Sequence, residues 1–288
     1  MLPGATLWAD PHSPARTTAI AWHATRPADA QQMDKIATQS VARWIGNWNS
    51  TVQGDVNLAT TTIVAAGALP VFVAYNIPQR DCGGYSGGNN TSARAYRDWI
   101  LAFANGIGAR PAAVVLEPDA LAGMDCLSAR DQLVRLDLLN FAVQALASKG
   151  SIAVYLDAGN PHWKPAATIA KRLRAAGIAH AQGFSLNVSN FYLTADNLSY
   201  GTEVSAMVGG KHFIIDTSRN GLGPADDAQW CNPPGRALGI RPTTATGNQL
   251  VDAYLWIKAP GESDGSCNGA PAAGIWMPEY ALGLAQRG

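Results

Sequence analysis

The sequence predicts an α/β fold in which about seven parallel strands form a closed or nearly closed barrel. Short runs rich in β-branched residues recur along the chain, and helix-like segments separate them. Strands that alternate with helices pair in parallel, because each crossover helix returns the chain to the same end of the sheet. No Gly-rich dinucleotide-binding turn follows a strand, which argues against a doubly wound sheet. The predicted strands are residues 43–45, 71–75, 113–117, 152–157, 183–188, 212–216 and 252–257.

The segments between these strands carry the pattern of amphipathic helices, as residues 95–108 and 130–150 illustrate. Gly150 ends the second segment, where a helix C-terminus favours a left-handed residue. Apolar residues in this segment recur at three- and four-residue steps, which predicts one buried face. They are Leu133, Leu136, Leu139, Val143 and Leu146.

The composition argues against two classes of partner. The chain has 288 residues, and 21 basic side chains balance 21 acidic ones. No basic stripe is available to neutralise phosphates, so we expect no nucleic acid as a partner. The longest apolar stretch, residues 63–75, is interrupted by Gly67 and Pro70 and is too short to span a bilayer. Because no linker, charge run or repeat divides the chain, we expect a single domain, with a monomer as the default state.

Four cysteines, Cys82, Cys126, Cys231 and Cys267, lie far apart in the sequence. They form no CxxC pair and the histidines form no HxxxH cluster, so we expect no zinc site and no other metal or cofactor. The cysteines are either buried thiols or two disulfides made in an oxidising compartment, and three pairings are open. Nine tryptophans and few lysines favour a secreted protein, although no signal peptide is visible in this chain.

Acidic side chains gather where the predicted strands end, which is where parallel α/β folds carry their catalytic groups. Each acid also has a simpler explanation, because an aspartate at the end of a strand can cap the helix that follows. Carboxylates that share a pocket repel each other, which raises the pKa of one of them and makes it a general acid near neutral pH. Glycoside hydrolysis needs one protonated and one ionised carboxyl group. The acids are Asp81, Asp119, Asp157, Asp216, Glu262 and Asp264, and Asn187 and Asn190 lie near another strand end.

Flat aromatic side chains accompany these acids. A sugar ring has apolar C–H faces, so tryptophans beside strand ends suit it as platforms, with packing in the core as the alternative. Trp99 and Trp256 lie within periodic or strand segments, and we expect them in the core. The tryptophans outside such segments are Trp44, Trp48, Trp163, Trp230 and Trp276.

A competing motif, Gly84-Tyr85-Ser86-Gly87-Gly88, matches the GxSxG elbow of serine hydrolases. The elbow requires its serine directly after a strand, whereas the strand signal here ends at Tyr75. No histidine in a late loop follows a convincing triad aspartate. A serine esterase that uses Ser86 is therefore an alternative with little support.

Several strings occur together in this chain: YNIPQRDCGGYSGG, VVLEPDAL, VYLDAGNPHW, FSLNVSNF, IDTSRNGLGP, WCNPPGRALG and AYLWIKAPGESDGSC. In this order they resemble glycoside hydrolase family 6, the cellulases that cleave β-1,4-glucan with inversion, and most of all its bacterial endoglucanases. The resemblance begins near residue 43, and the first forty residues match poorly, so we expect no site residue before Trp44. Asn160 and Pro161 depart from the DAGHSxW string of many bacterial relatives, so the contact there is expected to differ.

The resemblance implies a distorted seven-stranded β/α barrel with an open cleft, in which residues 1–288 are one catalytic domain without a carbohydrate-binding module or linker. Asp119 matches the general acid, and Asp81 matches the acid that raises the pKa of Asp119 and organises water. Asp264 matches a candidate catalytic base whose role in the family is contested. A second water held near Ser86 and Asp81 is the alternative route.

The resemblance also implies a set of sugar contacts and two disulfides. Tyr75 matches the tyrosine beneath the distorted sugar at the cleavage point. The disulfides would be Cys82–Cys126 and Cys231–Cys267, each holding an active-site loop. Together with the strand-end asparagines, the full set of expected substrate-binding residues is Trp44, Tyr75, Ser86, Asp157, Trp163, Asn187, Asn190, Trp230, Lys258 and Glu262.

Loop length separates two modes of attack within this family. Exo-acting members close long loops into a tunnel, whereas the loop after Cys82 and the segment from Asp216 to Asp252 are short. We therefore expect endo-acting hydrolysis of β-1,4-glucan outside the cell. An exo-acting cellobiohydrolase is the alternative, followed by a non-catalytic glycan-binding barrel. Three crowded aspartates argue against a pure binder, because such a protein has no use for their repulsion.

Overall fold

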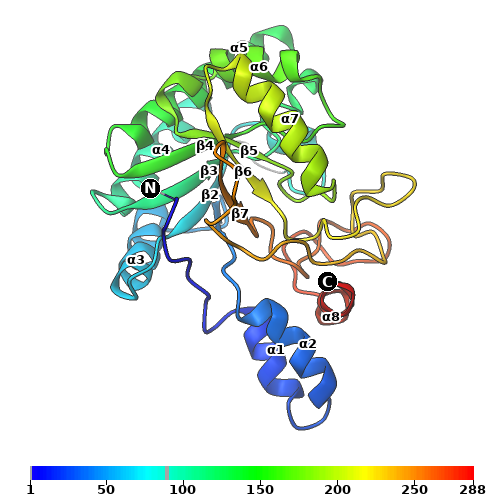
Figure 1. Ribbon diagram of the computed structural model, residues 1–288. Coiled ribbons are helices and arrows are strands. Elements are labelled where there is room, and N and C mark those ends of the chain that lie inside the picture. Colours follow the sequence, from blue (N-terminus) through cyan, green and yellow to red (C-terminus); the bar gives the residue numbers. More distant parts are fainter. Residues whose placement is uncertain (1, 88–90) are drawn as a thin grey trace.

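The structure is a computed structural model that describes residues 2–87 and 91–288, in which seven parallel strands form one curled sheet (Figure 1). Neighbours in the sheet are neighbours in sequence, which is the order that repeated right-handed crossovers produce. The predicted strands are all confirmed, three with identical bounds and the others within two residues. The strands are β1 (Arg43–Gly46), β2 (Val71–Tyr75), β3 (Ala112–Leu116), β4 (Ile152–Asp157), β5 (Gly183–Leu186), β6 (His212–Asp216) and β7 (Val251–Leu255).

The sheet curls until its edge strands β1 and β7 approach each other. The backbone N–H of Ala42 donates to the carbonyl of Trp256 at 2.9 Å. The indole N–H of Trp44 donates to the carbonyl of Ile257 at 2.8 Å. Among the described residues, β1 and β7 form no strand ladder with each other, and these two hydrogen bonds join the two edges of the sheet. The expectation of a distorted, nearly closed barrel is therefore confirmed.

Alternation along the strands divides the core in two. Phe72, Val114 and Leu156 point outward and pack against the surrounding helices. Val115 and Tyr155 point inward and belong to the cluster that fills the barrel. Because strand side chains alternate between the two faces, a fully buried parallel strand reads as a continuous apolar run. The filled interior leaves the ends of the barrel as places for chemistry.

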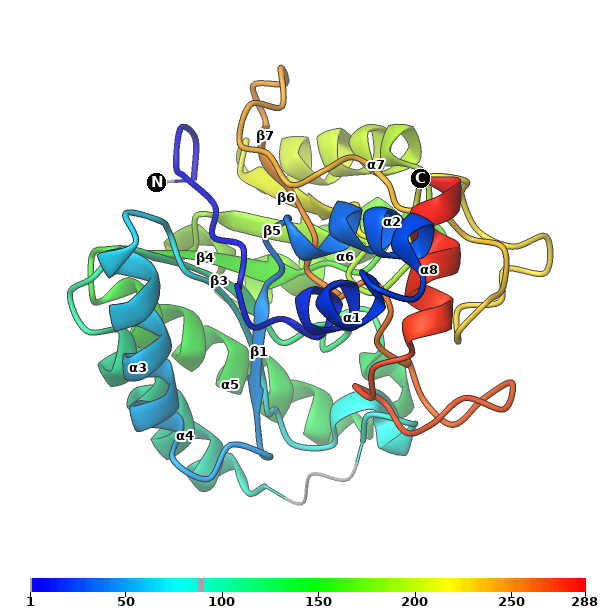
Figure 2. The same ribbon diagram turned by 90° about the horizontal axis from the view of Figure 1, so that it is seen from below.

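Helices cover the outside of the sheet, and α1, α2 and α8 form a separate group at one side (Figures 1 and 2). This group packs small residues around Met33 and Ile36 and covers the buried ring of Trp256. In the described residues the helices are α1 (Pro14–Trp22), α2 (Pro27–Ala37), α3 (Val52–Ala65), α4 (Ala93–Ile107), α5 (Ala129–Ala147), α6 (Ala166–Ala175), α7 (Thr194–Met207) and α8 (Pro278–Arg287), with single 3₁₀ turns at Arg80–Gly83, Met124–Cys126 and Ile178–His180.

Helix α5 confirms one predicted helix but shifts its buried face. The hydroxyl of Ser128 accepts the backbone N–H of Asp131 and so caps the first turn. Gly150 has φ of +72°, the left-handed conformation expected after the helix. Leu133, however, is 69% exposed, and Arg135 is buried instead. The guanidinium of Arg135 donates to the carbonyls of Pro78 and Gln79 in the loop after β2. Periodicity does not reveal such a contact.

Within the described part of the chain, no helix combines the length and apolar content needed to cross a bilayer.

Candidate active site

A cleft of about 1240 Å³ lies where the strands end in the loops that lead to the helices. Most of the predicted site residues line it, although they come from distant parts of the sequence. Because all seven strands are parallel, their carboxyl ends converge on this one face. The predicted residues that line the cleft are Trp44, Tyr75, Asp81, Ser86, Asp119, Trp163, Asn190, Trp230, Lys258, Glu262 and Asp264.

Asp119 follows β3 in a strained backbone and reaches the cleft partly buried. Its φ is +69°, and Glu117, two residues earlier, also has a positive φ of +51°. Such conformations cost energy in residues other than glycine and gather at functional sites. Burial, then the charges of Asp157 and Asp81, hold the pKa of Asp119 well above its usual range. Asp119 can therefore keep its proton at a pH where an ordinary aspartate has lost it.

Asp157 lies behind Asp119, so the expected sugar contact is corrected. It is 1% exposed and is absent from the residues that line the cleft. Its Oδ1 accepts the backbone N–H groups of Asp119 at 2.9 Å and Gly159 at 3.0 Å. Burial raises the pKa of Asp157 to about 6. Asp157 therefore positions Asp119 and adds a negative charge beside it.

Asp81, Ser86 and Tyr75 form a connected group at the end of β2. The backbone N–H and the hydroxyl of Ser86 both donate to Oδ2 of Asp81 at 2.9 Å. The hydroxyl groups of Ser86 and Tyr75 are 2.8 Å apart. Burial and the charge of Asp119 raise the pKa of Tyr75, which keeps its hydroxyl protonated. The ring of Trp44 meets Tyr75 edge to face, with 5.1 Å between centroids.

This arrangement differs from a serine nucleophile elbow. Ser86 contacts a carboxylate and a phenol, whereas a triad serine contacts a histidine. The serine also lies eleven residues beyond the end of β2, in a loop that follows a 3₁₀ turn. Gly88, the last residue of the GxSxG match, lies outside the described residues. The geometry therefore gives the esterase alternative no support.

Arg80 holds the loop that carries Asp81 and Ser86, a role that the sequence did not indicate. The side chain is 5% exposed. Its guanidinium donates to the carbonyls of Ser86 and Tyr75, both at 2.7 Å, and lies 4.4 Å from the ring centre of Tyr75. The only signal in the sequence is that Arg80 precedes Asp81, an adjacency that would permit an ion pair between them. Arg80 instead binds backbone carbonyls.

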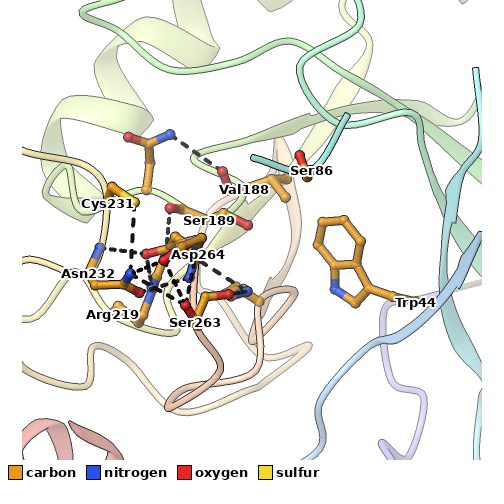
Figure 3. A network of polar contacts seen from close by, with 12 residues as sticks. Trp44, Ser86, Val188, Ser189, Arg219, Cys231, Asn232, Ser263 and Asp264 are labelled. Atoms are coloured by element: carbon orange, nitrogen blue, oxygen red, sulfur yellow. Dashed lines mark hydrogen bonds and ion pairs between the residues drawn. The ribbon is translucent and has the colours of Figure 1, made fainter. Parts of the chain in front are cut away.

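Asp264 belongs to a buried network on the other side of the cleft (Figure 3). Its Oδ2 accepts from the guanidinium of Arg219 at 2.8 Å and from the backbone N–H of Asn232 at 3.0 Å. Arg219 is fully buried and also donates to the carbonyl of Ser189 at 2.6 Å. The other oxygen, Oδ1, lies 3.8 Å from the ammonium of Lys258. Arg219 is a second site residue that sequence reasoning missed, because its partner lies 45 residues away.

Lys258 and Glu262 also lie at this side of the cleft. The ammonium of Lys258 donates to the carbonyl of Ser263 at 3.0 Å, and burial lowers its pKa. Burial raises the pKa of Glu262. Asp216 was one of the acids expected at the strand ends, but it is fully buried and its carboxylate accepts backbone N–H groups, including that of Lys258 at 3.0 Å. It fixes the loops and does not line the cleft.

Asn187 is a second correction to the expected sugar contacts. It is 1% exposed, has φ of +65° and does not line the cleft. Its side-chain amide donates to the carbonyl of Asp216 at 2.9 Å and accepts the backbone N–H of Tyr192 at 3.2 Å. Asn190, three residues on, does line the cleft. The short turn between them explains why only one side chain reaches the open face.

The aromatic side chains follow the expected division. Trp256 is 1% exposed, whereas Trp48, Trp163 and Trp230 are 55%, 37% and 50% exposed and line the cleft. Trp8 also lines it, together with nearby residues of the N-terminal segment. The cleft therefore also includes side chains before Trp44, where no site residue was expected. Trp8 carried the same signal as the others, a tryptophan outside any periodic segment.

Both implied disulfides are present. Cys82 pairs with Cys126, and Cys231 pairs with Cys267. The first joins the loop of Asp81 to the segment after Asp119. The second lies beside Asp264, because Asn232, which follows Cys231, forms two hydrogen bonds with Asp264. The backbone N–H of Asn232 donates to the carboxylate of Asp264, and the side-chain oxygen of Asn232 accepts the backbone N–H of Asp264. Each bridge therefore limits the motion of a loop that carries an acid.

Comparisons with known proteins agree with this architecture. The chain is 46% identical over 269 residues to Endoglucanase A of Cellulomonas fimi, covering 92% of this chain and 58% of that protein. It is 42% identical to Endoglucanase 1 of Streptomyces halstedii, covering 96% and 87% of the two chains. It thus spans a little over half the length of one curated relative and most of another.

A solved structure gives the same result. The endoglucanase Cel6 of Mycobacterium tuberculosis, in complex with methyl-cellobiosyl-4-deoxy-4-thio-β-D-cellobioside, superposes with a TM-score of 0.94 at 45% identity, over 99% of this chain and 98% of that chain. The sequence model of the glycosyl hydrolases family 6 matches residues 2–288, so the family likeness also includes the N-terminal segment that resembled it poorly. The chain belongs to glycosyl hydrolases family 6.

Proposed function

We propose that this chain is an endoglucanase that hydrolyses internal β-1,4-glucosidic bonds of cellulose and soluble β-glucans with inversion. The observation that carries the proposal is the environment of Asp119. This carboxyl group lines the cleft, and burial and two neighbouring aspartates raise its pKa. A protonated carboxyl group in a cleft with exposed tryptophans suits a general acid that acts on a glycosidic oxygen.

The endo-acting mode is supported by the names of the relatives. Both curated relatives reported above, and the similar solved structure, are named endoglucanases. The cleft is lined by loops from both sides and by the N-terminal segment. We include in the proposal that residues 1–288 act as one catalytic domain, as a monomer and outside the cell. Size-exclusion chromatography with light scattering tests the monomer, and activity in culture supernatant tests the location.

Inversion requires a water molecule on the face of the sugar opposite the acid. Two groups can orient it. Asp264 lines the cleft, and Arg219 neutralises its buried charge while Oδ1 stays near Lys258. Ser86 and Asp81 are the second group, since their hydrogen bond places a hydroxyl beside a carboxylate. We propose Asp264 as the base. Asp264→Asn then lowers kcat at least as much as Ser86→Ala, and the reverse order would assign the water to Ser86 and Asp81.

The test of the main proposal compares the wild type with Asp119→Ala on carboxymethylcellulose and cellohexaose. We expect a rapid loss of viscosity, α-anomeric products by NMR, and a rate about 100- to 10,000-fold lower in the variant. Slow viscosity loss with mainly cellobiose released would indicate an exo-acting enzyme. Binding of glucan without cleavage by the wild type would indicate a non-catalytic binding barrel.

A further inference from the structure

Two rings stack on the wall of the cleft at a place that the acid chemistry does not use. The imidazole of His162 and the phenol of Tyr192 are nearly parallel, with 4.4 Å between centroids and 19° between planes. His162 lies in the loop after β4, and Tyr192 lies in the loop after β5. Both line the cleft, His162 exposed and Tyr192 half-buried. His162 directly precedes Trp163, a predicted sugar platform, in the sequence.

The backbone beneath Tyr192 is held in place. Its N–H donates to the side-chain oxygen of Asn187 at 3.2 Å. Its carbonyl accepts from the side-chain amides of Asn197 at 3.1 Å and Asn220 at 3.0 Å. These three asparagines are themselves buried. The phenol is therefore attached to a rigid support before any ligand arrives.

The loop of His162 is fixed in a similar way. The backbone N–H of His162 donates to the side-chain oxygen of Asn160 at 3.1 Å, and Pro161 between them restricts the backbone. Asn160 is 5% exposed. The same residues form the part of the chain that departs from the usual family string. Asn160 and Pro161 therefore hold the turn that presents the ring of His162.

A pre-arranged ring pair on the wall of a cleft is suited to bind a sugar. In the stack, each ring covers one face of the other, and the exposed His162 lines the cleft. A flat ring of this kind packs against the C–H face of a pyranose, while its N–H meets a hydroxyl at the sugar edge. Little rotamer entropy is lost on binding, because the rings are already ordered.

We propose that His162 and Tyr192 form an additional subsite that binds one glucose unit of a long β-1,4-glucan beyond Trp163. This inference rests on the proposed function, because it names a further part of the same substrate. A short oligosaccharide fills the positions around Asp119, whereas a longer one also reaches the ring pair. The subsite therefore acts on chain-length preference and leaves the chemical step unchanged.

The experiment measures binding in an Asp119→Asn background, so that no substrate is cleaved. Isothermal titration calorimetry compares cellotetraose with cellohexaose for the background protein and for His162→Leu and His162→Phe added to it. Leucine provides an apolar side chain without a flat face, whereas phenylalanine provides a flat aromatic ring without the N–H. His180→Leu, at an exposed histidine in the 3₁₀ turn before β5, is the matched control.

We expect His162→Leu to weaken cellohexaose binding by about five- to tenfold while cellotetraose changes by less than about twofold. His180→Leu should leave both affinities close to the background values. His162→Phe keeps the flat ring but lacks the ring N–H, so it should weaken cellohexaose binding less than His162→Leu does. Equal affinities in His162→Leu and the background, or equal weakening for both oligosaccharides, would overturn the subsite while the glucanase proposal stands. If the background protein binds neither oligosaccharide and the wild type cleaves neither, both proposals fall together.

Discussion

Asp157→Asn tests whether a buried charge sets the working pH of the proposed general acid. The amide oxygen of asparagine can still accept the backbone N–H groups of Asp119 and Gly159, so the geometry is retained. The negative charge is removed. Because that charge raises the pKa of Asp119, its removal lowers this pKa. A general acid works only while protonated, so the activity of the variant should be lost at a lower pH than that of the wild type.

The size of the effect follows from the separation of the two groups. The backbone nitrogen of Asp119 lies 2.9 Å from Oδ1 of Asp157. The side chain of Asp119 starts at the Cα atom bonded to this nitrogen. We therefore take the separation of the two carboxyl groups as roughly 6 Å. At an effective dielectric constant of ~20, two charges at this distance interact by about 3 kcal/mol, or about two pKa units. Water in the cleft screens part of this interaction, so we expect a downward shift of about one unit.

The assay is the initial rate of reducing-sugar release from carboxymethylcellulose from about pH 4 to about pH 9. Asp157 takes up its own proton near pH 6, so the two enzymes should converge at acid pH and separate above it. The matched control is Asp137→Asn. Asp137 is exposed on α5 and forms an ion pair with Arg97 on α4. The reasoning would be refuted if the midpoint of the activity loss at alkaline pH differed between Asp157→Asn and the wild type by less than about 0.2 pH units.

Substitutions at three further places probe the supports of the site. Arg80→Met leaves the buried carbonyl of Tyr75 and the partly buried carbonyl of Ser86 without their donor. It should cost about 2–4 kcal/mol in urea unfolding, with a fall in kcat larger than the change in KM. Arg219→Met leaves the carboxylate of Asp264 buried without its nearest cation, which should cost about 3–5 kcal/mol. Adding Asp264→Asn should recover most of that loss, and a double variant as unstable as the single one would contradict this account. Replacing Cys82 and Cys126 by serine opens a loop of 44 residues, and the loss expected from chain entropy is about 4 kcal/mol, which a non-reducing urea titration measures.

The strands and the acids at their ends were predictable from the sequence. Buried parallel strands are short apolar runs that need no information about partners, and β2, β4 and β6 begin and end where the runs do. Parallel pairing then brings strand ends to one face, so Asp81 and Asp119 were expected to meet. The pairing of the cysteines followed only from the family resemblance, because three pairings satisfy the sequence equally.

The tertiary structure decided which side chains face the substrate and which support them. Asp157 and Asn187 were expected at the sugar, yet each turns inward to hold a backbone. Arg219 finds Asp264 across 45 residues, and Trp8 joins the cleft from the far end of the chain. Local periodicity reports only whether a position is buried on its own element. Contacts between residues distant in sequence decide which buried charges neutralise each other and which loop covers a strand end. These contacts form only when the barrel closes.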